Sequence, residues 1–100
     1  MENYRNQEIY DKIENWTDRL TRHFKEENPT YPFELKYVAS YGKTWIKILR
    51  ADPSTKSVFA FVDWDGNIYK PASYKAPAKG IRATLDDAPL NMEQLYRRRW

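Results

Sequence analysis

Cysteine is absent from this chain of 100 residues, and His23 is its only histidine. The first absence excludes disulfides, thiolate metal sites and cysteine nucleophiles. The second excludes a multi-histidine metal site and leaves one imidazole for acid–base chemistry. Because no set of titratable groups converges in the sequence, we expect no metal and no cofactor, and we expect that the protein is not an enzyme.

Long apolar runs are also missing. No segment approaches the ~20 apolar residues that a transmembrane helix needs, and no signal peptide follows Met1. The mean hydropathy is −0.92, yet hydrophobic residues make up 41% of the chain, which is enough for one folded core. We therefore expect one domain over residues 1–100, located in the cytoplasm and without a membrane partner.

An amphipathic pattern opens the chain. Apolar side chains recur at intervals of three or four residues, at Ile9, Ile13, Trp16, Leu20 and Phe24. This spacing places all five on one stripe of a helix. Because the residue before a proline avoids helical geometry, the step from Asn28 to Pro29 ends the pattern. The sequence predicts a helix over residues 5–27.

Alternating apolar and polar residues follow, separated by turn signals. The expected strands are Phe33–Tyr41, Trp45–Arg50, Val58–Val62 and Asn67–Lys70. Asp65 and Gly66 give the strongest hairpin signal. Near the end of the chain, Asn91 and Gln94 resemble a capping box that starts a short helix. The prediction is an α+β fold in which the long N-terminal helix packs on an antiparallel meander of three or four strands, with a short C-terminal helix.

Three patterns suggest chemistry but favour a simpler interpretation. Asp63 and Asp65 flank a turn, where aspartate commonly bonds the backbone, and no third ligand completes a metal site. The sequence contains no nucleophilic serine motif for which His23 could act as the general base. Residues 42–44 (GKT) resemble the last three residues of a phosphate-binding loop, but the upstream glycine of that motif is missing and a predicted strand follows. We expect none of the three to be a catalytic or metal site.

Positive charge is concentrated in the last third of the chain. Residues 67–100 hold seven basic and three acidic residues, although the whole chain carries a net charge of only +3. Residues 67–82 contain no acid and interleave cations with tyrosines, namely Tyr69, Lys70, Tyr74, Lys75, Lys79 and Arg82. Such cations can follow a phosphate backbone, and tyrosine rings can stack on bases. A solvated loop whose tyrosines fill the edge of the core accounts for the same pattern.

The stretch YKPASYKAPAKGIR, residues 69–82, resembles the shared core of small bacteriophage-encoded proteins of unknown function. That core reads roughly YKPASWKAPAKxxRG. Tyr74 stands where those proteins more often have tryptophan, and Ala83 where they have glycine. The resemblance covers about residues 57–85, and it implies a small phage accessory protein that works in the host cytoplasm.

These observations give one main hypothesis and two alternatives. The main hypothesis is binding of nucleic acid through residues 67–82, with Arg97 and Arg98 strengthening the positive field. The first alternative is a protein-interaction factor that binds or inhibits a host enzyme or defence protein through aromatic and arginine side chains, namely Tyr74, Arg82, Arg97 and Trp100. The second alternative is an oligomeric structural component that pairs through an exposed edge strand at Phe33–Tyr41.

Overall fold

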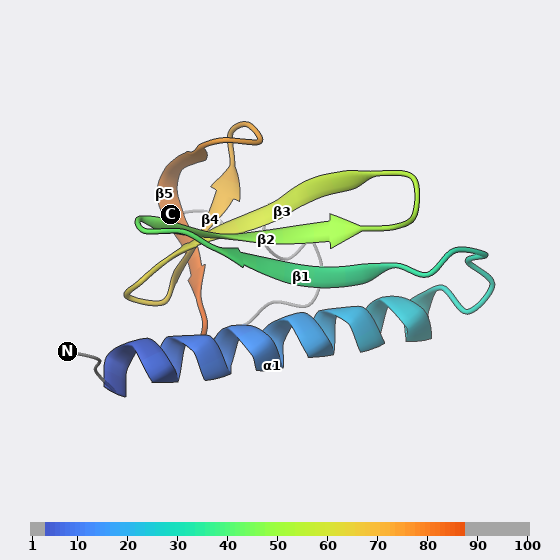
Figure 1. Ribbon diagram of the computed structural model, residues 1–100, viewed down its shortest axis with the longest axis horizontal. Helices are drawn as coiled ribbons and strands as arrows, with labels where there is room; N and C mark the ends of the chain where they lie inside the picture. Colours follow the sequence, from blue (N-terminus) through green and yellow to red (C-terminus); the bar gives the residue numbers. More distant parts are fainter. Residues whose placement is uncertain (1–3, 88–100) are drawn as a thin grey trace.

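The computed structural model describes residues 4–87, which form one helix and one antiparallel sheet (Figure 1). Helix α1 spans Tyr4–Glu27, as the apolar spacing predicted. Five strands follow in chain order: β1 Lys36–Tyr41, β2 Trp45–Ala51, β3 Lys56–Asp63, β4 Asn67–Pro71 and β5 Pro77–Thr84. Each strand pairs with the next, so the sheet order is β1-β2-β3-β4-β5 and the topology is a meander. The expected α+β class is confirmed.

The prediction of three or four strands was wrong, because the sheet has five. The missed strand is β5, whose sequence PAKGIRAT shows no regular alternation. Its pairing with β4 shifts register twice, and such shifts break the two-residue period on which strand prediction depends. Pro77 begins the strand, a position where a missing N–H is tolerated. The short C-terminal helix expected from Asn91 lies outside the described residues.

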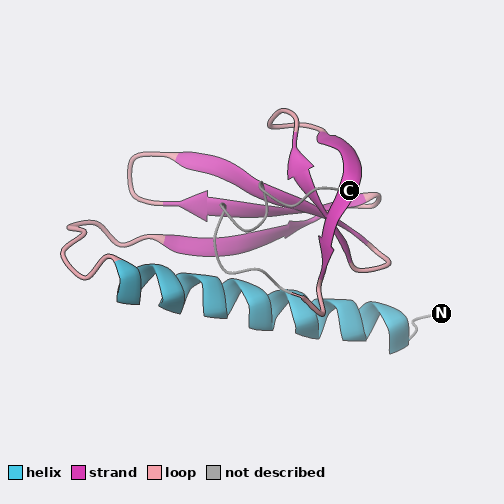
Figure 2. Ribbon diagram, turned by 180° about the vertical axis from the view of Figure 1, so that it is seen from behind, coloured by secondary structure: helices cyan, strands magenta, loops and turns pink. Residues whose placement is uncertain are grey.

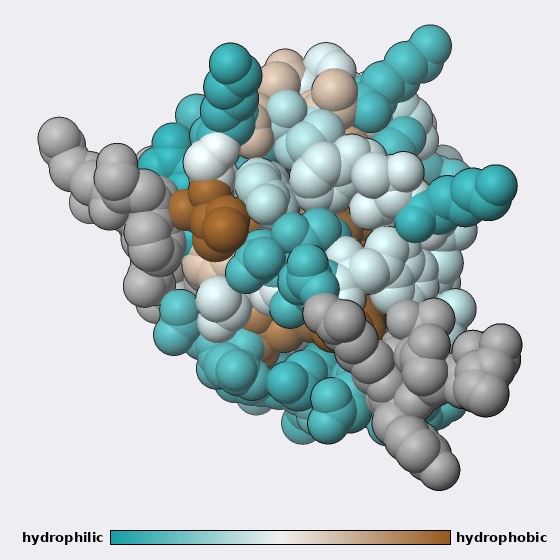
Figure 3. Space-filling view, turned by 90° about the vertical axis from the view of Figure 1, so that its left-hand side faces the viewer, coloured by the Kyte–Doolittle hydropathy of each residue, from teal (hydrophilic) through white to brown (hydrophobic). Residues whose placement is uncertain are grey.

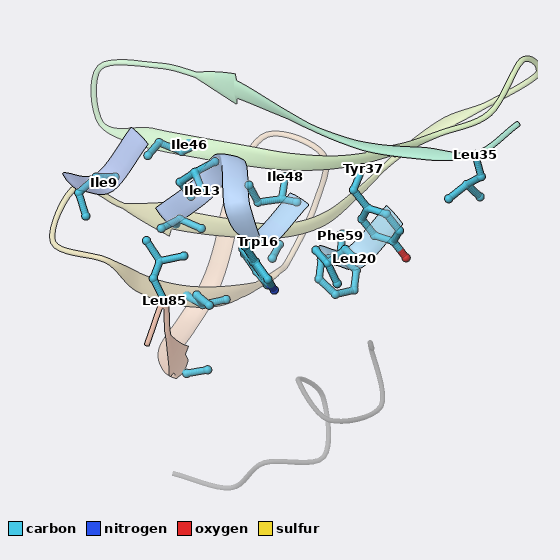
Figure 4. Close-up of a cluster of buried hydrophobic side chains, with 14 residues drawn as sticks. Ile9, Ile13, Trp16, Leu20, Leu35, Tyr37, Ile46, Ile48, Phe59 and Leu85 are labelled. Atoms are coloured by element: carbon cyan, nitrogen blue, oxygen red, sulfur yellow. The ribbon is translucent and has the colours of Figure 1, made fainter. Parts of the chain in front are cut away.

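Helix α1 lies along one face of the sheet (Figures 1 and 2). The predicted stripe faces the sheet, since Ile9, Ile13, Trp16 and Leu20 are all buried. Figure 4 shows these side chains meeting residues of the sheet in one cluster. All five strands contribute to that cluster, through Tyr37, Ile46, Ile48, Phe59, Ala60, Val62, Ile68 and Ala83. Within residues 4–87, no helix is both long and apolar enough to cross a membrane.

A β-bulge in β3 turns Phe59 toward the helix. The pairing of β2 with β3 shifts by one residue before Leu49, which leaves Phe59 as the extra residue. Regular alternation would place Phe59 on the same face as Phe61. Instead Phe59 joins the core beneath α1, where its ring centroid lies 6.0 Å from that of Trp16 and 5.3 Å from that of Tyr37.

The edge strand β1 is tied to α1 near its start. The Thr21 hydroxyl donates to the Thr17 carbonyl oxygen at 2.9 Å and accepts the backbone N–H of Tyr37 at 3.0 Å. This bond satisfies one N–H of a strand that has a strand neighbour on only one side, and so limits pairing with another chain. The strand begins at Lys36 rather than at the expected Phe33, which is 53% exposed.

Phe59→Ala should lower the free energy of unfolding by about 3–5 kcal/mol, because the variant leaves a cavity against Trp16. Urea-induced unfolding followed by tryptophan fluorescence measures the difference. Val58→Ala is the matched control, since Val58 precedes the bulge and is only half-buried; it should cost about 1 kcal/mol or less. Equal effects of the two substitutions would contradict the assignment of Phe59 to the helix side.

Candidate nucleic-acid interface

The predicted binding residues that the structure describes lie on one hairpin, which projects from the sheet away from α1 (Figure 1). They occupy β4, the connecting turn and β5 in pairs: Tyr69 and Lys70, Tyr74 and Lys75, Lys79 and Arg82. The structure therefore brings these six residues together on one unit of the fold. The other two predicted residues, Arg97 and Arg98, lie outside the described residues.

The turn at the tip of the hairpin is held by local hydrogen bonds. Ala72 and Ser73 each donate a backbone N–H to the carbonyl oxygen of Ala76 at 3.0 Å. The Ser73 hydroxyl oxygen accepts the backbone N–H groups of Lys75 and Ala76, both at 3.2 Å. This serine turn fixes the backbone on either side of Tyr74.

Tyr74 is the most exposed aromatic residue of the hairpin. It is 51% exposed, and the Lys47 ammonium lies 4.2 Å from the centroid of its ring. An exposed cation–π contact contributes about 0.5–1 kcal/mol, which is enough to orient a ring without burying it. Sequence reasoning missed the contact between Lys47 and Tyr74. The only signal was the alternation of Trp45–Arg50, which places Lys47 on the face opposite the core residues of β2.

Tyr69 has a different environment. Its ring packs edge-on against Trp45 with centroids 5.1 Å apart, and its hydroxyl donates to Asp63 Oδ2 at 3.1 Å. Burial, followed by the hydrogen bond to Asp63, raises the pKa of Tyr69. Trp45 also contacts the buried ring of Phe61, with centroids 6.1 Å apart. Tyr69 therefore belongs to an aromatic layer opposite α1, at the base of the hairpin.

A groove separates the hairpin from the first half of β3. Among the described residues, β3 pairs with β4 only at Phe61↔Tyr69 and Val62↔Ile68, and the two strands diverge beyond these pairs (Figure 1). The groove has a volume of about 340 Å³. Its lining contains no carboxylate and consists of Lys56, Ser57, Val58, Pro71, Ala72, Ser73 and Tyr74.

Asp63 organises the turn between β3 and β4. Its carboxylate accepts the backbone N–H groups of Asp65 and Asn67 at 2.9 Å, in addition to the Tyr69 hydroxyl. Gly66, at φ 89°, supplies the left-handed conformation that this turn requires. The Asp63 carboxylate therefore holds the turn, and Asp65 lies within that turn. The part of the chain that the structure describes holds no group of three histidine, cysteine or carboxylate side chains suited to a metal ion.

An aromatic cluster joins the N-terminal half of α1 to the turns of the sheet. Tyr10 packs edge-on against Tyr41 and Trp64, with centroid distances of 4.8 and 5.5 Å. Trp64 donates to the Gly42 carbonyl oxygen at 3.0 Å, and Tyr41 donates to the Glu14 carboxylate at 2.9 Å. Burial and this second bond raise the pKa of Tyr41. Because Tyr41 and Trp64 direct their polar atoms to partners within the molecule, we interpret the cluster as a clamp between helix and sheet. Figure 3 shows the surface at this end, where brown hydrophobic residues lie among teal and pale ones.

A second aromatic cluster lies at the C-terminal end of α1. Phe24, Tyr31 and Phe33 pack edge-on in series, with centroid distances of 5.2 and 5.9 Å. They line a pocket of about 270 Å³, and the Arg50 guanidinium lies 5.1 Å from the centroid of Phe24. Sequence reasoning missed both clusters, since no periodic spacing links the helix to the turns and loops that complete them.

The whole chain matches a family model, described as a family of unknown function (DUF7717), over residues 1–100. No curated protein and no solved structure matches the chain. Function therefore has to be inferred from the surface of the molecule itself.

Asp63→Ala should lower the free energy of unfolding by about 1–3 kcal/mol, because several donors of the turn lose their acceptor. Urea-induced unfolding measures the change. Asp65→Ala is the matched control and should cost less, since Asp65 is exposed and enters the turn through its backbone N–H. Mg²⁺ should leave the unfolding midpoint of the unsubstituted protein unchanged. A stabilisation by Mg²⁺ that Asp63→Ala abolishes would instead support a metal site.

Proposed function

The chain belongs to the DUF7717 family of unknown function, and we propose that it binds nucleic acid through the hairpin of residues 67–82. The observation that carries the proposal is Tyr74, a half-exposed ring oriented by Lys47 at the tip of a hairpin without a carboxylate. A ring among cations offers the two contacts that nucleic acids accept, stacking for bases and charge for phosphates.

The phosphate contacts are assigned to the four basic residues of the hairpin, Lys70, Lys75, Lys79 and Arg82. Lys47 on β2 and Lys56 on β3 add positive charge beside the hairpin. Phosphate contacts set the position and the salt dependence of binding but carry no sequence information. The stacking contact is assigned to Tyr74, while Tyr69 packs against Trp45 at the base of the hairpin.

We also propose that the protein is a phage accessory protein that acts in the host cytoplasm. The support is the resemblance of residues 57–85 to small phage-encoded proteins. Those residues include nearly the whole of β3 and all of β4 and β5, and they contribute to both walls of the groove. The resembling segment and the proposed binding surface are therefore the same part of the molecule.

Recognition of a host protein is a second candidate function. It is favoured by the cluster at the C-terminal end of α1, where Phe33 is exposed beside a pocket of about 270 Å³. Exposed aromatic side chains next to a pocket are typical of interface hot spots. Under this alternative, Phe33→Ser abolishes binding of a nuclease-resistant host partner, whereas Tyr74→Ala leaves that binding unchanged.

Titration of labelled single-stranded DNA, RNA and duplex DNA at several salt concentrations tests nucleic-acid binding. Four phosphate contacts predict a slope of about −3 to −4 in a plot of the logarithm of the binding constant against that of salt concentration. Combined replacement of Lys70, Lys75 and Lys79 by alanine should flatten the slope by about 2–3, because each phosphate contact contributes about one unit.

The matched control removes three positive charges elsewhere. Combined replacement of Arg19, Lys25 and Lys43 by alanine changes the net charge equally, at exposed positions on α1 and in the β1–β2 turn. This variant should keep a slope within about one unit of the unsubstituted protein. Equal losses in the two triple variants would assign binding to general charge, and a slope near zero for every ligand would overturn the proposal.

A further inference from the structure

We infer that the nucleic acid is single-stranded and that the groove between β3 and the β4–β5 hairpin holds one unpaired base, stacked on Tyr74. The inference rests on the proposed nucleic-acid binding and adds the form of the ligand and its position. It is carried by the open edge of β3, the size and charge of the groove, and the placement of the Tyr74 ring.

The edge of β3 offers backbone hydrogen bonds to a ligand in the groove. Within residues 4–87, β3 has a strand partner on its β4 side only at Phe61 and Val62. Along residues 56–60, the backbone N–H and C=O groups on that side have no strand partner among the described residues, and the bulge at Phe59 interrupts their regular alternation. Such groups require a partner, and the edge of a nucleobase presents the matching pattern of neighbouring donors and acceptors.

The size and charge of the groove suit one base. Its volume of about 340 Å³ is near the lower limit of small-ligand pockets, which extend over about 300–1,000 Å³. A base within a duplex does not reach such a space, because its edge is paired and its faces are stacked until it is extruded. Lys56 lines the groove and Lys47 contacts Tyr74, so positive charge lies beside the path of the flanking phosphates.

Tyr74 forms part of the groove wall. Lys47 holds its ring, and the bonds around Ser73 hold its backbone, so little freedom is lost when a base stacks on it. An extended peptide can also pair with an open strand edge. The groove favours a nucleic acid because its only charged lining residue is basic and because its size suits a single planar group better than a row of peptide units.

An oligonucleotide with a single base tests the inference. The probe is a labelled DNA strand that is abasic at every position except one, and the reference is the fully abasic strand of equal length and charge. The single base should tighten binding roughly 5- to 150-fold, the range measured for stacking of one base on an aromatic ring. A duplex of ordinary sequence should bind more weakly than either of its separated strands.

Two substitutions locate the base. Tyr74→Ala should remove the gain that the single base provides, whereas Tyr74→Phe should retain it, because phenylalanine keeps the ring and loses only the hydroxyl. Neither change alters the charge, so the salt slope should be the same in all three proteins. Thermal unfolding of both variants should match the unsubstituted protein, since Tyr74 is half-exposed in a turn.

The outcomes separate this inference from the proposed function. Equal binding of the single-base and fully abasic strands, with normal salt dependence, leaves nucleic-acid binding in place and overturns the base site. Equal binding of duplex and single strands likewise leaves nucleic-acid binding in place, and it overturns the inference that the ligand is single-stranded. If no strand binds at low salt, both the proposed nucleic-acid binding and the base site are overturned. Binding of an acidic peptide that Tyr74→Ala abolishes, in the absence of oligonucleotide binding, assigns the groove to a protein strand and also overturns both.

Discussion

The rest of this structure depends on the packing of one long helix against one face of the sheet. α1 is the only described element on that face, so its stripe has to meet residues from all five strands. Trp16 reaches Phe59 because the bulge in β3 turns that ring toward the helix. A bulge also bends its strand and increases the local twist. The bulge therefore links the packing of α1 to the course of β3, the strand that also carries Phe61 on the other face.

The face opposite α1 is closed by aromatic rings and by the β4–β5 hairpin. Phe61 is fully buried there, beside Trp45, which in turn packs against Tyr69. Register shifts in β4 and β5 bend the hairpin away from β3 after only two residue pairs. Pro71 and Pro77 face each other where the hairpin ladder ends, and neither has an N–H to extend it. The groove thus lies where the hairpin leaves β3, beside the aromatic layer opposite α1.

The sequence predicted an element correctly where a regular spacing of apolar residues specifies that element. The stripe of α1 has a regular spacing, and its helix was predicted to within one residue. β5 was missed because two register shifts remove its period. The candidate hairpin was found from charge and aromatic content, but Lys47 lies more than twenty positions from Tyr74 and only the folded sheet brings the two together. The contacts that distinguish Tyr69 from Tyr74 are likewise tertiary.

Tyr69 and Tyr74 show how the residues of one basic and aromatic segment divide between packing and the binding that we propose. Packing accounts for Tyr69, whose ring lies against Trp45 and whose hydroxyl is bonded to Asp63. It does not account for Tyr74, because the turn is held by Ser73 and by backbone bonds, and half of the tyrosine remains in solvent. A turn of this kind does not require an aromatic residue. Tyr74 instead contacts Lys47 at the rim of the groove, and this placement is the reason that we propose a stacking role for it and not for Tyr69.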